Sequence, residues 1–393
     1  MHDSTVIIAG ARTPIGKLLG DLSSLTAPEL GGVAIAAALD RAGIEPRSLD
    51  AVTLGTVVQA GVGAGPARQA ALAGGVPLSV PATTINKLCL SGLTAIGQSD
   101  LAIRAGYWSV ALAGGMESMS NAPHLLRGAR RGYRYGQAAA EDALERDALI
   151  CSIENVVMGA ATDRHQRALG ISRYDQDQFA AESHRRAADA IAAGRFDDEI
   201  TAVTIAGRGG DTIVIRDQGV RPETTEAALA ALTPAFGSEG TITAGSASQL
   251  SDGAAALVVM SRSEAERRGL EWLAEIVSYG TAAGPDSSLL LQPASAITDA
   301  LRRQDQIGLD DLAVIEMNEA FASVPLASAR ELGIDIDRVN PNGGAIALGH
   351  PVGMSGARLV LTLAYELRRR GGGYGAAALC GGGGQGDALI IRV

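Results

Sequence analysis

Apolar runs alternate with alanine-rich segments along the first part of the chain. Residues 5–10 (TVIIAG) are almost wholly apolar, and 28–43 (PELGGVAIAAALDRAG) has the composition of a helix. The same pair of patterns follows at 49–58 (LDAVTLGTVV) and 67–75 (ARQAALAGG). Short apolar runs are typical of buried strands, and longer alanine-rich segments are typical of helices. The alternation predicts βαβ units and hence a layered α/β fold with a largely parallel sheet.

The pattern recurs late in the chain. The segment ALDRAGIEPRSLDAVTLGTV begins at Ala38 and ALRRQDQIGLDDLAVIEMNEA begins at Ala300. Each predicts a helix, a short turn containing Ile, a Leu-Asp pair and a strand. Farther along, an apolar run precedes a glycine cluster at 109–119 (SVALAGGMESM) and at 375–386 (GAAALCGGGGQG). An internal duplication would build the 393 residues from two similar halves.

Residues 121–249 differ in composition and pattern from the segments on either side, which predicts an insertion between the halves. They contain an arginine cluster at 127–136 (RGARRGYRYG) and a charged helical segment at 171–194. A hairpin is predicted at 202–215 (AVTIAGRGGDTIVI), with RGGD as its tight turn. The arginines are interpreted first as a solvated face, with an oligomer contact as the alternative.

Charge and cysteine usage exclude several classes of function. A net charge of -10 argues against non-specific binding to nucleic acid, although a local basic patch can still bind a small anion. Cys89, Cys151 and Cys380 are three in number and show no CxxC spacing, so neither a disulfide framework nor a metal site is predicted. No secretory signal or membrane span is recognised. We expect a cytoplasmic protein that binds neither membrane nor nucleic acid.

The stretch 86–92 (NKLCLSG) places a thiol among polar and glycine neighbours. The preceding TTIN (83–86) predicts a strand end, and Asn86 is a candidate helix cap. Apolar positions then follow at helical spacing: Leu90, Leu93, Ile96, Leu101 and Ile103. This spacing puts Cys89 in the first helical turn, where the helix dipole lowers a thiol pKa. The alternative is a small buried hydrophobic residue.

Three other positions carry candidate chemistry. His350 lies in a glycine-lined loop before a long helical segment within 340–371, where an imidazole acts near neutral pH. Cys380 ends an apolar strand and enters four glycines, whose N–H groups suit an oxyanion site. Asn318 in EMNEAFA follows an apolar strand and is either a helix cap or a group that holds a water or carbonyl. Two thiols and one imidazole suit covalent acyl transfer.

These motifs together resemble the thiolase family, in its acetyl-CoA acetyltransferase branch. The resemblance spans the chain, through ARTPIGK (11–17), NKLCLSG, AGGMESM (113–119), TAGSASQLSDGAAA (243–256), NEAFA, GGAIALGHPVGMSGAR (343–358) and CGGGGQG. It implies two duplicated five-layer αβαβα halves plus an inserted loop domain. The implied boundaries are 1–120 completed by 250–270 for the first half, 121–249 for the loop domain, and 271–393 for the second half.

The resemblance also implies roles for the residues in these motifs. Cys89 is implied as the nucleophile that takes the acetyl group, His350 as the group that activates its thiol, and Cys380 as the acid/base. One oxyanion site is implied from His350 and a water held by Asn318. The other is implied from the backbone N–H groups of Cys89 and Gly382.

Ligand contacts are implied in the same way. Ser248 and Arg221 are implied for coenzyme A, and Leu149, Met158 and Phe321 for the acyl pocket; an exposed solubilising charge is the alternative for Arg221. The implied partners are acetyl-CoA, acetoacetyl-CoA and CoA, with a homodimer or homotetramer as the assembly. Coenzyme A thioesters are substrates, so no resident cofactor and no metal are implied.

Two departures from the family pattern affect the acyl-chain preference. Val157 stands where related enzymes often carry His, and 283–297 (AGPDSSLLLQPASAI) replaces a compact Gly-Pro-x-Pro version. The expected reaction is the reversible condensation of two acetyl-CoA. The alternatives are a degradative 3-ketoacyl-CoA thiolase for longer or branched chains and a non-catalytic acyl-CoA or lipid carrier. A decarboxylative condensing enzyme would be expected to use a second His where Cys380 stands.

Overall fold

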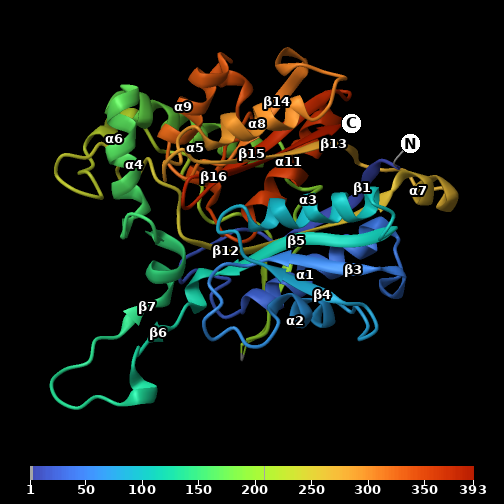
Figure 1. Ribbon diagram of the computed structural model, residues 1–393, viewed down its shortest axis with the longest axis horizontal. Coiled ribbons are helices and arrows are strands. Elements are labelled where there is room, and N and C mark those ends of the chain that lie inside the picture. The colour runs from blue at the N-terminus through green and yellow to red at the C-terminus, as the bar shows by residue number, and fades with distance from the viewer. Residues whose placement is uncertain (1–2, 208) are drawn as a thin grey trace.

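The computed structural model describes residues 3–207 and 209–393, and Figure 1 shows two sheet-and-helix halves stacked on each other. The first half contains β1 (Thr5–Arg12), β2 (Gly16–Lys17), α1 (Ala27–Ala42), β3 (Ala51–Gly55), α2 (Pro66–Ala73), β4 (Ala82–Ile85), α3 (Ser91–Arg104), β5 (Val110–Ser118) and β12 (Ser251–Ser261). After α7 (Arg262–Arg268), the second half contains β13 (Ala274–Ala283), α8 (Gln292–Arg302), β14 (Leu312–Met317), α9 (Ser323–Leu332), α10 (Ala345–Leu348), α11 (Ser355–Arg369), β15 (Tyr374–Gly381) and β16 (Gln385–Arg392).

Five layers stack in the order helix, sheet, helix, sheet, helix. The helices α1 and α2 cover the outer face of the first sheet and share an apolar core with β1, β3, β5 and β12. The helices α3 and α11 lie between the two sheets, where side chains of β5, β12, β15 and β16 meet them in the largest core. The helix α8 covers the outer face of the second sheet. The predicted α/β thiolase-type layering is therefore present.

The sheet is mixed, so the prediction of a largely parallel sheet is wrong. Both sheet layers belong to one continuous path of strands, in the order β14-β15-β16-β13-β1-β12-β5-β3-β4, with β2 paired to β12 beside it. Among the described strand pairs of this path, β3–β4, β3–β5 and β14–β15 are parallel, and the others are antiparallel. Parallel neighbours need a helical crossover, which these three pairs have. By contrast, β15 and β16 are joined by a short glycine turn, and β12 pairs antiparallel with β5 after the inserted segment. Residues 5–7 of β1 pair with β13 and join the two halves.

Local signals explain why the predicted first helix forms. Thr26 caps α1: its Oγ1 accepts from the N–H of Glu29, and the Glu29 carboxylate accepts from the N–H of Thr26 at 2.8 Å. This reciprocal pair satisfies two of the free N–H groups at the helix start. Gly43 ends the helix with φ of 61°, a left-handed conformation that favours glycine. The helix therefore ends where the apolar pattern does.

The predicted insertion combines one long helix, α5 (Arg173–Ala192), with short strands and short helices. The short elements are β6 (His124–Leu125), β7 (Glu141–Asp142), β8 (Ile150–Cys151), β9 (Val156–Val157), α4 (Met158–Gln166), β10 (Val203–Ile205), β11 (Thr212–Val214) and α6 (Glu226–Ala230). The predicted hairpin is present, since β10 and β11 pair antiparallel; Arg208 of its RGGD turn lies outside the described residues. The arginine cluster 127–136 is exposed between β6 and β7, which project from the body in Figure 1.

A buried arginine ties the insertion to the core. Arg12 at the end of β1 is fully buried, and its guanidinium contacts Glu199 at 2.6 Å and Asp217 at 2.7 Å. Paired charges with hydrogen bonds are the form in which a buried arginine is tolerated. The insertion is therefore held against the first half from both ends of the 199–217 segment. Among the described helices, none is long and apolar enough to cross a membrane. The division of the chain into three domains at the residues given above stays a prediction.

Candidate active site

One cavity of about 440 Å³ is lined by most of the residues that the sequence analysis singles out, although Asn318 and Arg221 are not in its wall. Its wall combines residues of the first half, the insertion and the second half. The predicted residues in the wall are Cys89, His350, Cys380, Gly382, Ser248, Leu149, Met158 and Phe321. Residues that are far apart in the chain therefore share one chamber. The wall is mainly apolar, so water inside it is displaced easily by an acyl group.

The loop that carries Cys89 corrects two predictions. The helix α3 begins at Ser91, so Cys89 lies just before the helix and not in its first turn. Asn86 does not cap the helix, because its side-chain N–H donates to Val57 O and its Oδ1 accepts from Leu88 N. Cap propensity is a local preference, and here the loop's contact with the neighbouring strand end overrides it.

Burial controls the thiol of Cys89. The pKa of Cys89 is raised to about 11, mainly by burial and in part by charge repulsion from the carboxyl group of Glu117. The N–H groups of Cys89 itself and of Gly382 act in the opposite direction, because they face the sulfur. The expectation of a lowered thiol pKa is therefore wrong. Cys89 is a neutral thiol at pH 7, and a base must remove its proton before it can attack.

His350 lines the same cavity and has the charge and tautomer that such a base needs. It lies between α10 and α11, and its Nδ1 is 2.6 Å from Ser355 Oγ. Because Ser355 Oγ donates its own proton to Pro351 O, it accepts from His350, which places the ring proton on Nδ1. Burial and the charge of Arg358 lower the pKa of His350 to about 3. The ring is therefore neutral, and Nε2 carries the lone pair that can accept a proton.

Asn318 reaches this imidazole and is not a helix cap. Its Nδ2 lies 3.3 Å from His350 Nε2, while α9 begins only at Ser323. Its backbone N–H donates to Ala378 O, which fixes it beside β15. The Oδ1 of Asn318 is buried and has no partner among the described residues. Of the two interpretations of Asn318, the structure favours the amide that holds a ligand or water.

Cys380 and Gly382 form the opposite wall. Cys380 is the next-to-last residue of β15 and is buried. Burial and the nearby Cys89 raise the pKa of Cys380 above its usual range. A Cβ on Gly382 would lie 2.3 Å from Met158 Cε and 2.8 Å from Leu88 Cδ1, so the ends of both side chains would have to shift. The glycine identity of Gly382 allows its backbone N–H to approach the Cys89 sulfur.

Glu117 is a part of the site that sequence reasoning missed. This fully buried carboxylate accepts from the N–H groups of Val57, Val58 and Gly353 at 2.9 to 3.2 Å, and from Thr56 Oγ1. It therefore ties the His350 loop to the loop after β3. Burial raises its pKa to about 7. The sequence did contain a signal for this residue, since Glu117 is the one carboxylate in segment 109–119, whose other residues are mostly small or apolar.

The substrate side of the cavity contains most of the predicted contacts. Phe321 packs edge-on against Phe236, with ring centroids 5.9 Å apart. Val157 and Leu289, from the two segments that depart from the family pattern, also belong to the wall. Arg221 is exposed and outside the wall, and its backbone N–H donates to His184 Nδ1. The structure thus places Arg221 apart from the other predicted contacts.

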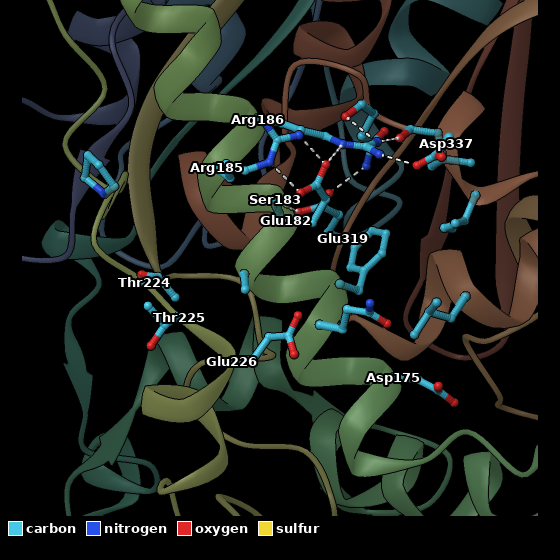
Figure 2. A pocket seen from close by; sticks show the side chains of 18 residues that line it. Asp175, Glu182, Ser183, Arg185, Arg186, Thr224, Thr225, Glu226, Glu319 and Asp337 are labelled. Carbon is cyan, nitrogen blue, oxygen red and sulfur yellow. Dashed lines mark hydrogen bonds and ion pairs between the residues drawn. The ribbon is translucent and has the colours of Figure 1, made fainter.

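A second cavity, of about 510 Å³, lies between α5 and the second half, and Figure 2 shows its side chains. Its charged groups are largely paired with one another: Glu182 contacts Arg185 and Arg186, and Arg186 also contacts Asp337 at 2.7 Å. Such pairing leaves few groups to bind or react. The cysteines and the imidazole make the first cavity the candidate active site.

Known proteins match the whole chain. Residues 5–263 match the family model "Thiolase, N-terminal domain", and 270–393 match "Thiolase, C-terminal domain". A probable acetyl-CoA acetyltransferase of Mycolicibacterium smegmatis is 54% identical over 98% of this chain and 100% of its own. An acetyl-CoA acetyltransferase of Cupriavidus necator is 45% identical over 98% of each. The crystal structure of the Bacillus anthracis acetyl-CoA acetyltransferase superposes with a TM-score of 0.97 at 40% identity, covering 100% of this chain and 99% of that one. The chain belongs to the thiolase family.

Proposed function

We propose that this thiolase-family acyltransferase is an acetyl-CoA C-acetyltransferase. It condenses two acetyl-CoA into acetoacetyl-CoA plus CoA, through an acetyl-cysteine intermediate, and runs in reverse as thiolysis. The observation that carries the proposal is the meeting of Cys89, His350, Cys380 and Gly382 around one cavity. The names of the relatives support the acetyl group as the transferred unit.

The first half-reaction uses Cys89 and His350. The Nε2 atom of His350 takes the proton of the Cys89 thiol, and the sulfur attacks the thioester carbonyl of acetyl-CoA. The resulting oxyanion collapses, the bond to the CoA sulfur breaks, and His350 returns the proton to that sulfur. The N–H groups of Cys89 and Gly382 face the region where the oxyanion forms. Each such donor contributes about 3 to 4 kcal/mol to stabilising the transition state in other acyl-transfer enzymes.

The second half-reaction uses Cys380. Nε2 of neutral His350 takes the proton of the Cys380 thiol, and the thiolate then removes an α-proton from a second acetyl-CoA, which restores the thiol. The carbanion attacks the carbonyl of acetyl-Cys89 and releases acetoacetyl-CoA and the Cys89 thiolate, which takes its proton back from His350. An α-proton is a weaker acid than a thiol, so the raised pKa of Cys380 makes its thiolate a better matched base. In this step His350 and a water held by Asn318 stabilise the thioester oxygen that becomes the enolate.

The walls fit a short acyl group and its pantetheine arm. Leu149, Met158 and Phe321 provide apolar contacts, and Ser248 provides the polar contact for the arm. Arg221 is exposed and outside this chamber, and it is proposed for the adenine end of coenzyme A. No metal or redox cofactor enters the scheme, since coenzyme A thioesters supply all its atoms.

A second candidate is thiolysis of longer 3-ketoacyl-CoAs, which the apolar side chains Leu289 and Val157 in the wall favour. Initial rates of thiolysis on a four-carbon substrate and on eight- to sixteen-carbon substrates separate the two. We expect the four-carbon substrate to react fastest; faster cleavage of the longer chains would support the second candidate. We expect Cys89→Ala to abolish acetyl exchange, and full exchange in that variant would instead indicate a non-catalytic carrier.

The assembly is also a proposal. Leu126, Tyr133 and Tyr135 are exposed on the arm between β6 and β7. Exposed large apolar side chains on a projecting segment favour contact with another copy of the chain. We propose a homo-oligomer, either a dimer or a tetramer, which the molar mass in solution distinguishes from a monomer.

A further inference from the structure

We propose that Lys87 and Asp387 are positioning residues of this acyl transfer. Their ion pair holds the loop of Cys89 against the strand that pairs with the strand of Cys380. The inference rests on the proposed function, because it concerns the second half-reaction, in which both sulfurs act on one pair of substrates.

Both carboxylate oxygens of Asp387 accept hydrogen bonds from side chains of other elements. Its Oδ1 accepts from Lys87 Nζ at 2.7 Å, and its Oδ2 accepts from Thr94 Oγ1 at 2.6 Å and from Tyr279 OH at 2.8 Å. The carboxylate is fully buried, and 26% of the Lys87 side chain is exposed. Burial and the Asp387 charge raise the pKa of Tyr279, so its hydroxyl keeps its proton and donates. Asp387 thus joins β16 to β13, to α3 and to the nucleophile loop.

The sequence positions of the pair make it a connection between the two thiols. Lys87 stands two residues before Cys89. Asp387 follows Gly386, whose register partner on the neighbouring strand is Cys380. The ion pair therefore joins the loop that carries the Cys89 sulfur to the strand that pairs with the strand of Cys380. Lys87 and Asp387, both in the described part of the chain, stand outside the lining of the cavity.

The surrounding packing shows that the nucleophile loop and the second sheet fit closely. A Cβ on Gly381 would lie 2.6 Å from the Leu90 side chain, and one on Gly382 would lie 2.8 Å from Leu88. Leu88 itself has φ of 55°, a left-handed conformation rarely adopted by a residue with a branched side chain. A loop in this conformation needs contacts on both sides to hold it.

The backbone and side chain of Lys87 supply those contacts together. Its N–H donates to Ser91 Oγ at 2.8 Å, and its ammonium group reaches Asp387 across the interface between the halves. A charge-assisted hydrogen bond to a buried carboxylate is stronger than a neutral one. Without it, the loop is free to move away from β16. The distance between the carbonyl of acetyl-Cys89 and the carbanion formed by Cys380 then increases, whereas His350, which Ser355 holds on another segment, keeps its place.

The test separates the two half-reactions in the full-length chain. Acetyl-Cys89 formation is followed by mass spectrometry after mixing with acetyl-CoA, and condensation is followed by acetoacetyl-CoA release. We expect Lys87→Met to slow condensation by about 10- to 100-fold, the loss typical of a displacement near 1 Å, while acetyl-Cys89 forms within about threefold of the wild-type rate. Asp387→Asn, which keeps the side-chain shape, should show the same split. Lys87→Arg should restore condensation, because guanidinium also pairs with a carboxylate.

A matched control distinguishes positioning from stability. Arg173 and Asp177 on α5 form an ion pair at 2.7 Å with nearly the same exposure, 25% and 4%, but outside the cavity wall. Arg173→Met should lower the denaturation midpoint as Lys87→Met does and leave both half-reactions unchanged. The double variant Lys87→Met with Asp387→Asn should be no slower than either single variant, since both substitutions remove the same ion pair.

The outcomes are distinct. Equal slowing of both half-reactions, or no slowing in Lys87→Met and Asp387→Asn, would overturn the inference alone. If the wild-type protein forms no acetyl-Cys89, the proposed function is wrong, and this inference, which rests on it, is wrong as well.

Discussion

The Nδ2 atom of Asn318 lies 3.3 Å from the Nε2 atom of His350, and the other nitrogen of the ring faces Ser355 Oγ at 2.6 Å. The imidazole is thus held at both nitrogens. Ser355 fixes the proton on Nδ1, so Nε2 accepts from the amide N–H of Asn318 and must exchange this long contact for the thiol proton. A neutral ring in one tautomer is what the activation of a neutral thiol requires.

Ser355→Ala therefore tests the tautomer. Without the hydroxyl, the ring proton is free to move to Nε2, and the base is lost in that fraction of molecules. We expect acetyl-Cys89 to form about 10- to 100-fold more slowly, a part of what a positioned base contributes. Single-turnover mass spectrometry measures this rate. Ser328 is buried on α9 and donates to Leu290 O, so Ser328→Ala is the matched control and should react at the wild-type rate.

Glu117 is predicted to set the pH dependence of Cys89 reactivity. Its charge raises the pKa of Cys89, but Glu117 is ionised only above its own pKa of about 7. Glu117→Gln removes that charge, so the Cys89 pKa falls and more thiolate is present at alkaline pH. Alkylation by iodoacetamide, followed at Cys89 by mass spectrometry, should be faster in the variant at pH 9 and equal to the wild type at pH 6.

Equality at pH 6 is the internal control of that experiment. At this pH the carboxyl of Glu117 is mostly protonated, so Glu and Gln carry the same charge. A variant that is also faster at pH 6 would show that the loop had opened, and that the contacts of Glu117 with Val57 and Gly353 matter more than its charge. A variant slower at pH 9 would contradict the electrostatic argument.

Leu289 is predicted to limit the acyl chain. It is buried in the cluster that contains Cys380 and Phe321, and it faces the cavity. Leu289→Ala removes three carbon atoms from the wall, so the ratio of thiolysis rates on eight-carbon and four-carbon 3-ketoacyl-CoAs should rise by about 10-fold, the scale of one to two methylene contacts. Leu290 is equally buried but outside the wall. Leu290→Ala should cost about 2 to 5 kcal/mol of stability without changing that ratio.

The glycine-rich surroundings of two catalytic side chains were a usable signal in the sequence, whereas the partners of these side chains were not predictable. Cys380 and His350 stand in glycine-rich surroundings that predict exposed backbone near a ligand, and the structure places both at the cavity. By contrast, Lys87 and Asp387 pair across most of the chain, and an ion pair between such distant residues has no local pattern. Asn318 was ambiguous because capping and ligand holding use the same side chain, and only the His350 contact separates them.

Local propensity also misled in particular places. The βαβ rhythm predicts parallel neighbours only within one unit, and it does not describe β12, which returns after the insertion and pairs antiparallel with β5. The predicted start of α3 was too early, because the Leu88 conformation and the Lys87–Ser91 bond delay the helix to Ser91. The helix dipole was expected to lower the pKa of Cys89. Burial outweighs this effect, because it raises the thiol pKa by more than the two N–H groups lower it.

Cys380→Ser separates the two half-reactions chemically. A serine hydroxyl is a far weaker acid than a thiol, so its alkoxide is not populated and no base remains to remove the α-proton. The first half-reaction uses only Cys89 and His350, so acetyl-Cys89 should still form while acetoacetyl-CoA release falls by at least about 100-fold. Deuterium exchange into the methyl group of acetyl-CoA should stop as well, because it needs the same proton removal. Exchange that continued at the wild-type rate would assign the base to another residue, whereas loss of acetyl-Cys89 would show that the two sulfurs do not divide the work.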